Sequence, residues 1–180
     1  NSDTKFKMTK PKIWPGGVIP YVIDPGLKNE DSIIEAIEAI NSTGVINFIL
    51  RANETDYVRF KLGKENCYSN VGKVGGEQHI ILADSCNKGN ILHEILHTLG
   101  FFHEQSRHDR DEYLTIYWQN IEEKYWVQFK KIPQKFNQEI IADFDYDSIM
   151  LYGPTSFAKD TNYVTMTKSD NSIYTSNRSE

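Results

Sequence analysis

Three histidines fall within the eleven residues from His93 to His103, and this stretch constrains the fold more than any other part of the chain. His93 and His97 are four positions apart, so on a helix with about 3.6 residues per turn their imidazoles share one face. Gly100 follows three positions after His97, where a left-handed residue can end a helix without strain. The pattern therefore predicts a helix that presents two metal ligands, and a turn that returns His103 as the third.

This donor set predicts a catalytic zinc site. Three imidazole nitrogens leave a fourth position open for water, whereas structural zinc sites are closed by four protein ligands. Glu94 lies beside the ligands, where its carboxylate can take a proton from a water whose pKa zinc lowers from about 15.7 to about 7. The alternative for the short HExxH pattern is an amphipathic helix with exposed histidines, and Gly100 and His103 at their offsets argue against it. We interpret the apolar residues of the segment as packing alone: Ile91, Leu92, Ile95, Leu96 and Leu99.

The signature continues beyond the third histidine. The residues from His103 to Asp111 read HEQSRHDRD, and the motif Ser148-Ile149-Met150-Leu151-Tyr152 follows farther along the chain. With these motifs the sequence resembles the astacins, a family of metzincin zinc endopeptidases, and carries both the HExxHxxGFxHExxRxDRD pattern and the SxMxY Met-turn. Residues 14–21 are similar to the family's N-terminal strand, and residues 67–72 to its first cysteine loop.

The resemblance implies an α+β, zincin-like catalytic domain of two lobes. We expect the 180 residues to form one such domain, because a chain of this length with 39% hydrophobic residues can build a single core. The upper lobe, about residues 1–100, would hold a mixed twisted sheet and the zinc helix. The lower lobe, about residues 101–180, would be irregular, with the metal at the junction. The sequence stops at Glu180, where the family runs on into a C-terminal helix, so we expect a truncated C-terminal end.

The resemblance also implies roles for further residues. Glu94 would be general base and then general acid, Met150 an apolar floor under the metal, and Tyr152 a fifth ligand that moves to stabilise the oxyanion. Glu104 would meet the mature N-terminus by way of water. From the residues alone, Met150 is equally a buried thioether and Tyr152 an aromatic side chain in a turn. Those alternatives stay open.

Cys67 and Cys86 are the two cysteines of the chain and lie nineteen positions apart. In a secreted protein they predict one disulfide, whereas in a cytosolic protein they would be two reduced thiols. The resemblance favours the bridge, because astacins pair cysteines at these two places. Gly44 stands where the family usually has a further cysteine, so we expect no second bridge.

The predicted function is that of a secreted, extracellular zinc endopeptidase that cleaves protein or peptide substrates. The resemblance implies a zymogen with a removable inhibitory propeptide, and we expect a monomer. A net charge of -5 without a basic run argues against nucleic acid and anionic membrane surfaces, and there is no apolar run near 18 residues that could span a bilayer. Because the chain opens with Asn1 rather than Met, we expect that any targeting segment has been removed. The alternative function is a zinc-binding, non-catalytic protein-recognition module, which would not need Glu94.

Alternating and β-branched segments predict strands at residues 18–24, 45–50, 57–62 and 79–82. The family resemblance implies that the last of these is the sheet edge, where a peptide could add by backbone hydrogen bonds. Helical spacing predicts helices at residues 33–40, 88–99 and 119–131, the third ended by Pro133. We expect a structural ion-pair network from Arg107, Asp109, Arg110 and Asp111.

Overall fold

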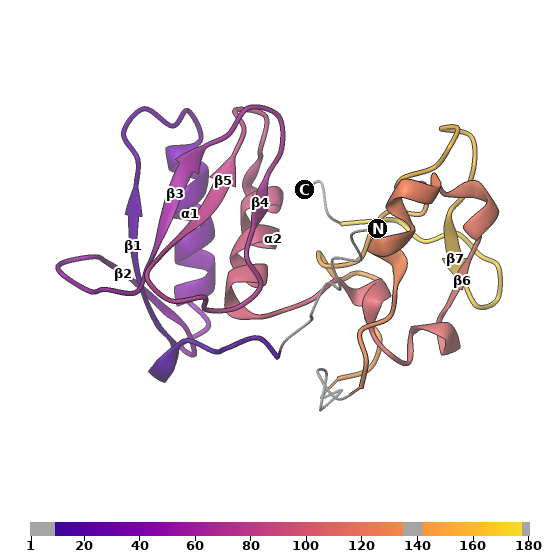
Figure 1. The fold of residues 1–180 in the computed structure, drawn as a ribbon, viewed down its shortest axis with the longest axis horizontal. Helices are drawn as coiled ribbons and strands as arrows, with labels where there is room; N and C mark the ends of the chain where they lie inside the picture. The colour runs from indigo at the N-terminus through magenta and orange to yellow at the C-terminus, as the bar shows by residue number, and fades with distance from the viewer. Residues whose placement is uncertain (1–9, 135–141, 178–180) are drawn as a thin grey trace, which may run out of the picture.

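The computed structural model describes residues 10–134 and 142–177, and these form two halves joined near residue 100 (Figure 1). The sheet half, residues 10–100, contains the larger sheet and both α-helices. The loop half, residues 101–134 and 142–177, contains short 3-10 helices and a two-stranded sheet. This is the α+β, two-lobed fold that was predicted. Neither α-helix in these ranges has the length and apolar character needed to cross a membrane.

The larger sheet is mixed, with the strand order β2-β1-β3-β5-β4. Its first four strands in that order run parallel, and β4 pairs antiparallel with β5 through two residues only. The prediction that residues 79–82 form the sheet edge is wrong, because β4 covers that side of β5. A two-residue strand is too short to show an alternating pattern, so no periodicity along the chain signals it. The strand bounds are Val18–Ile23 for β1, Asn47–Leu50 for β2, Tyr57–Leu62 for β3, Tyr68–Ser69 for β4 and Glu77–Leu82 for β5.

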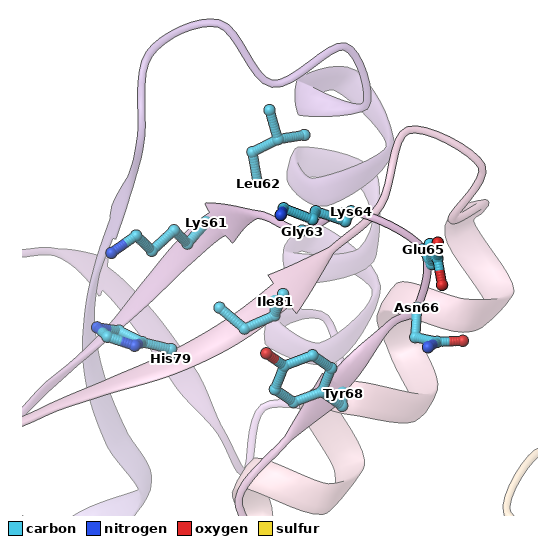
Figure 2. A pocket seen from close by; sticks show the side chains of 9 residues that line it. All are labelled: Lys61, Leu62, Gly63, Lys64, Glu65, Asn66, Tyr68, His79 and Ile81. Carbon is cyan, nitrogen blue, oxygen red and sulfur yellow. The ribbon is translucent and has the colours of Figure 1, made fainter.

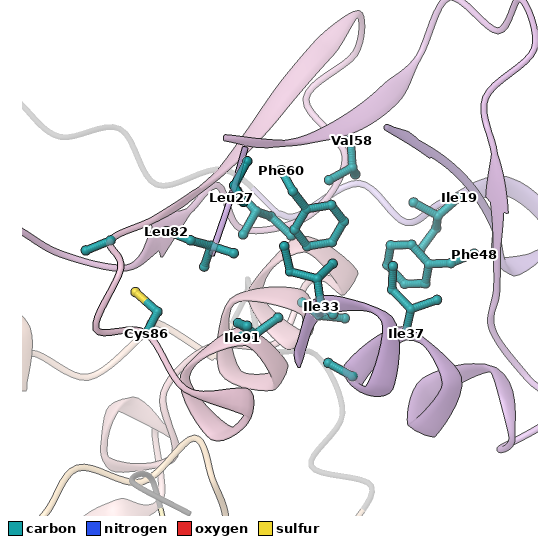
Figure 3. Close-up of a cluster of buried hydrophobic side chains, with 14 of the residues drawn as sticks. Ile19, Leu27, Ile33, Ile37, Phe48, Val58, Phe60, Leu82, Cys86 and Ile91 are labelled. Carbon is teal, nitrogen blue, oxygen red and sulfur yellow. The ribbon is translucent and has the colours of Figure 1, made fainter. Parts of the chain in front are cut away.

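Two α-helices, α1 (Glu30–Asn41) and α2 (Lys88–Leu99), pack on one face of this sheet (Figure 3). Acidic residues in the first turn of α1 interact favourably with the positive end of the helix dipole. A capping box between Asn87 and Asn90 begins α2, and Gly100 ends it with a φ of 110°. Their apolar faces meet the sheet in a largely aliphatic core that includes Ile19, Ile33, Ile37, Phe60, Ile80 and Ile91.

The segment that contains β4, residues 67–72, is attached to α2 at two points. Cys67 forms the predicted disulfide with Cys86, which lies just before α2. The amide of Gly72 donates a 2.8 Å hydrogen bond to the carbonyl of His97, in the last turn of the helix. Gly72 has a φ of 75°, and a Cβ there would lie 2.8 Å from the carbonyl oxygen of Lys12, so no other residue fits without a shift. The helix that carries two of the predicted ligands is therefore attached to this segment near its start and near its end.

The loop half is built around a second, aromatic-rich core. Its buried members are Leu114, Ile121, Phe129, Phe144, Leu151, Tyr152, Met166 and Tyr174. Regular structure is short: the small sheet pairs β6 (Leu114–Ile116) with β7 (Met166–Lys168), and the 3-10 helices are η2 (Glu104–Ser106), η3 (Arg110–Glu112), η4 (Trp118–Asn120) and η5 (Glu123–Phe129). One further 3-10 turn, η1 (Pro15–Gly17), precedes β1 in the sheet half.

The helix predicted at residues 119–131 is wrong. Two 3-10 helices, η4 and η5, stand in its place. Between them, Ile121 forms an isolated antiparallel bridge with Ala158, and the amide of Glu122 donates to the carbonyl of Phe157 at 3.2 Å. Because these backbone groups bond to another segment, they are not available for a continuous α-helix.

The predicted ion pairs form two separate groups. Arg107 bonds both Asp109, at 2.9 Å, and Glu104, at 2.8 Å. Arg110 pairs with Asp111, and its guanidinium also donates to the buried carbonyls of Gln105 and Phe129 at 2.7 and 2.9 Å. The hydrogen bonds from Arg107 hold the pKa of Asp109 below its usual value. These contacts tie the short helices of the loop half together.

Candidate metal centre

The three predicted ligands converge on one point. His93 and His97 come from one face of α2, and His103 follows the turn at Gly100. The Nε2 atom of His103 lies 3.1 Å from Nε2 of His93 and 3.1 Å from Nε2 of His97. Among the described residues, these three histidines form the group of potential metal ligands whose donor atoms are close enough to share an ion. The donor atoms all lie within 4.8 Å of one another.

The Nδ1 atoms of the two helical histidines point away from the centre and are hydrogen-bonded. These bonds set the orientation of the rings and so of the Nε2 atoms. Nδ1 of His93 lies 2.9 Å from the carbonyl oxygen of Ile149, and Nδ1 of His97 lies 2.8 Å from that of Phe101. A carbonyl only accepts, so each Nδ1 carries the proton and each Nε2 presents a lone pair. Lone pairs converging from imidazoles repel one another unless a cation lies between them. Three converging nitrogen donors, two of them with Nδ1 bonded to a carbonyl, match the arrangement that zinc-ligating histidines adopt, and the site fits this metal.

Glu94 lies next to the first ligand on α2 and is buried, with 4% of its surface exposed. Its carboxylate accepts a hydrogen bond from the hydroxyl of Ser69, on the edge strand β4, at 3.1 Å. The same hydroxyl lies 2.9 Å from the backbone carbonyl of Glu94. Sequence reasoning missed Ser69, because residues 67–72 were interpreted only as a cysteine loop.

Met150 and Tyr152 bring the loop half to the centre. Met150 is buried, and its carbonyl accepts a 3.0 Å hydrogen bond from the amide of Glu104, one residue after His103. The ring of Tyr152 lies against that of His103, with 4.4 Å between ring centroids. Its hydroxyl donates to Oε1 of Gln128 over 3.5 Å, and its carbonyl accepts from the hydroxyl of Tyr174 at 2.7 Å. Burial raises the pKa of Tyr174, so that this phenol stays a donor.

Several partners at this centre have no signature in the sequence. The carbonyls of Ile149 and Phe101 orient two histidines, yet any residue type would supply a carbonyl. Gln128 reaches Tyr152 from η5, in the segment predicted as a continuous helix. Only folding brings these groups together, so a pattern search along the chain could not have found them.

Glu104 is held within the loop half. Its carboxylate accepts from Arg107 at 2.8 Å and from the amide of Asp145 at 3.3 Å. The predicted partner, the mature N-terminus, lies outside the described residues.

A hollow lies on the sheet face away from the helices (Figure 2). It is lined by side chains of β3, β4 and β5 and of the loop between β3 and β4, among them Lys61, Tyr68, His79 and Ile81. Nε2 of His79 lies 2.8 Å from Oε1 of Glu77. Hydrogen bonds from Tyr57 and His79 lower the pKa of Glu77 to about 2. His79 therefore belongs to a polar cluster of the sheet.

Comparison with known proteins agrees with the geometry of the metal centre. The family model described as Astacin, a peptidase family, matches residues 6–177. The chain is 45% identical over 157 residues to astacin-like metalloprotease toxin 5 of Loxosceles gaucho, an alignment that covers 85% of this chain and 83% of the relative. It is 41% identical over 150 residues to zinc metalloproteinase nas-13 of Caenorhabditis elegans, covering 81% of this chain but 33% of that longer protein.

A solved structure shares the fold. High choriolytic enzyme 1, a hatching enzyme zinc-protease from the medaka fish Oryzias latipes, superposes with a TM-score of 0.82 at 34% sequence identity. The superposition covers 92% of this chain and 84% of that one, so it includes both the sheet half and the loop half.

Proposed function

This chain belongs to the astacin family of zinc metalloendopeptidases, and from that premise we propose that His93, His97 and His103 bind its one catalytic zinc ion while Glu94 serves as general base. The observation that carries the assignment is the convergence of three Nε2 atoms beside a buried carboxylate. A single domain spanning the whole chain is the simplest organisation for this activity, with the metal where the two halves meet.

The chemistry divides between the metal and the side chains. Zinc at this site supplies a water of lowered pKa and an electrophile for the scissile carbonyl. Glu94 takes the proton from the attacking water and gives it to the leaving amine, so one carboxylate acts as base and then as acid. Glu94 follows His93 directly on α2, and its burial and its hydrogen bond to Ser69 restrict the orientations that its carboxylate can take.

Residues of the loop half complete the centre in this proposal. The hydroxyl of Tyr152, which donates to Gln128 in this structure, would be a fifth ligand to the metal and would move to donate a hydrogen bond to the oxyanion that forms from the substrate carbonyl. Met150 provides an apolar floor, as its burial allows. Glu104 receives the mature N-terminus through water while it remains paired with Arg107.

The substrates are proteins or peptides, as the family implies. We place an extended substrate along β4, the edge strand that contacts Glu94, because its backbone can pair with a peptide whatever the side chains. The disulfide between Cys67 and Cys86 supports a secreted, extracellular protein. Removal of an inhibitory propeptide and activity as a monomer complete the proposal, and the net charge of -5 gives no support to a nucleic acid or membrane partner.

A non-catalytic, zinc-binding recognition module is the weaker candidate. Such a protein would keep the three histidines but would gain nothing from a buried carboxylate beside them. Burial of an ionised group is costly unless it is hydrogen-bonded, and Glu94 is both buried and bonded to Ser69. That arrangement is suited to catalysis.

The test replaces the proposed base. Glu94→Ala should retain about one zinc ion per chain and lose peptidase activity by roughly 10³-fold or more, because the ligands remain and proton transfer is removed. The matched control is Glu38→Ala, which removes an exposed carboxylate from α1 and should leave activity unchanged. Hydrolysis of a quenched peptide library and zinc content measured on the same samples decide the question. Wild-type turnover in Glu94→Ala would refute the mechanism.

A further inference from the structure

We propose that Ser69 is a positioning residue that holds the carboxylate of Glu94 in the orientation needed for proton transfer. The inference rests on the proposed role of Glu94 as general base and adds a residue that acts through it. It arises from one contact between the edge strand of the sheet and the zinc helix.

The geometry of β4 aims the hydroxyl at α2. Neighbouring residues of a strand point to opposite faces of a sheet. Tyr68 is paired with Ile81, and both line the hollow on the face away from the helices (Figure 2). Ser69 is paired with Ile80, which is fully buried in the core between sheet and helices. Ser69 therefore faces α2, and its side chain is short enough to leave room for the carboxylate of Glu94.

The hydroxyl contacts both ends of the same residue. Its Oγ lies 2.9 Å from the backbone carbonyl of Glu94 and 3.1 Å from Oε2 of its carboxylate. One hydroxyl hydrogen is shared between these two acceptors. The carboxylate is thereby tied to a fixed point of its own helix through Ser69. Glutamate has three side-chain torsions, so a tether at its end removes orientations that the burial of the stem does not exclude.

The segment that carries Ser69 is attached to α2 on both sides of this residue. Cys67, two residues before Ser69, is bridged to the start of α2. Gly72, three residues after it, bonds the carbonyl of His97 near the helix end. Ser69 is thus held between two attachments to the helix that carries Glu94. Because we also place the substrate along β4, Ser69 connects the strand that would bind the peptide to the residue that would act as base. Such supporting contacts hold catalytic groups within a fraction of an ångström of their working geometry.

The test compares two variants at one position, in the full-length, zinc-loaded protein. Ser69→Ala removes the hydroxyl and should lower kcat about tenfold, with KM within about twofold, because the base is less often oriented while the edge strand remains. Ser69→Thr keeps the hydroxyl and should restore most of kcat. The matched control is Ser42→Ala, which removes a hydroxyl bonded to a backbone carbonyl far from Glu94, and it should leave kcat unchanged.

The measurements are kcat and KM on one quenched peptide, zinc per chain, and the melting temperature. An unchanged kcat in Ser69→Ala would overturn the inference. A fall in kcat that follows loss of zinc or of folded protein would also overturn it, since the residue would then be structural. A threonine variant as slow as the alanine variant, with full zinc and an unchanged melting temperature, would count against the hydroxyl. Activity retained in Glu94→Ala would instead remove the premise, so the two failures are distinguishable.

Discussion

The two halves of this protein are stabilised by different kinds of contact. In the sheet half, backbone ladders and two helices enclose a core made largely of isoleucine, leucine, valine and phenylalanine. In the loop half, aromatic rings fill the core, and buried side chains satisfy the backbone: Arg110, 4% exposed, bonds the carbonyls of Gln105 and Phe129. Regular structure satisfies its own backbone groups, whereas irregular structure needs side chains to do so.

The metal centre draws on both halves. The sheet half supplies the two helical ligands and Glu94 on one rigid element. The loop half supplies the carbonyl of Ile149 behind His93 and the ring of Tyr152 beside His103. The sheet half therefore supplies two of the three histidines, whereas the loop half supplies His103 and the carbonyls of Ile149 and Phe101 that orient the helical pair.

The largest expected effects come from opening a cavity in each core. Phe60→Ala in the sheet half and Phe129→Ala in the loop half should each lower the free energy of unfolding by about 3–5 kcal/mol. Both rings are fully buried. Phe129 also packs against Tyr152, with 5.9 Å between ring centroids, so its variant alone should lower kcat of the folded enzyme. Urea unfolding and steady-state kinetics measure the two quantities. Equal kcat in both variants would contradict the division of roles.

The next prediction isolates one hydroxyl of the loop half. Tyr152→Phe should lower kcat by about 10²–10³-fold, or roughly 2.7–4 kcal/mol, with KM and zinc content almost unchanged, if the hydroxyl stabilises the oxyanion. A packing role predicts no change, because Phe fills the same volume. A ligand role predicts loss of zinc at modest chelator concentrations. Measuring kcat, KM and zinc on this variant distinguishes the three.

Removal of the disulfide tests the sheet half. Replacing Cys67 and Cys86 together by alanine should lower the free energy of unfolding by about 3 kcal/mol, because the bridge no longer restricts the unfolded chain. Zinc stoichiometry should stay near one, since the bridge touches none of the ligands. A thermal melt followed by circular dichroism checks the first statement. An unchanged melting temperature would show that the bridge contributes little here.

The smallest effect is a pH-dependent one in the loop half. Arg107 lowers the pKa of Asp109 in the folded protein, so the pair stabilises the fold above the ordinary carboxyl pKa of about 3.9. Asp109→Asn should cost about 1–3 kcal/mol at pH 7. The difference from wild type should shrink as the pH falls below about 3.9 and the wild-type carboxylate takes up a proton. Urea unfolding of both proteins in chelator, from pH 7 downward, measures it. A difference independent of pH would point to packing.

Sequence alone predicted most of the sheet half. The predicted bounds of β3, residues 57–62, and of α2, residues 88–99, are confirmed, because both elements are long enough to show a period and have clear ends. The helix predicted at residues 33–40 is confirmed within α1, although Ile34, part of its predicted apolar pattern, is 40% exposed. The prediction of the sheet edge failed, because β4 pairs with β5 through only two residues and so shows no period along the chain.

The loop half was far less predictable, for a physical reason. Its segments are ordered by partners distant in the chain, such as Ile121 with Ala158 and Tyr174 with Tyr152. Local pattern says nothing about such pairs. The convergence of the three histidines was predictable because helix geometry places residues four apart on one face, and the turn at Gly100 adds the third. Ser69 and Gln128 reach the centre only through tertiary structure.

The shortness of β4 also bears on solubility. An exposed sheet edge is a template on which other chains can pair and aggregate, and long flat edges are the most hazardous. Here the edge is bounded by the bridged Cys67 and by Gly72, whose amide is already bonded to α2. The open stretch between them, residues 68–71, is at most about 13 Å long at roughly 3.3 Å per residue. An edge this short offers too few backbone groups to nucleate a growing sheet of neighbouring molecules, and yet a single extended peptide can still lie along it.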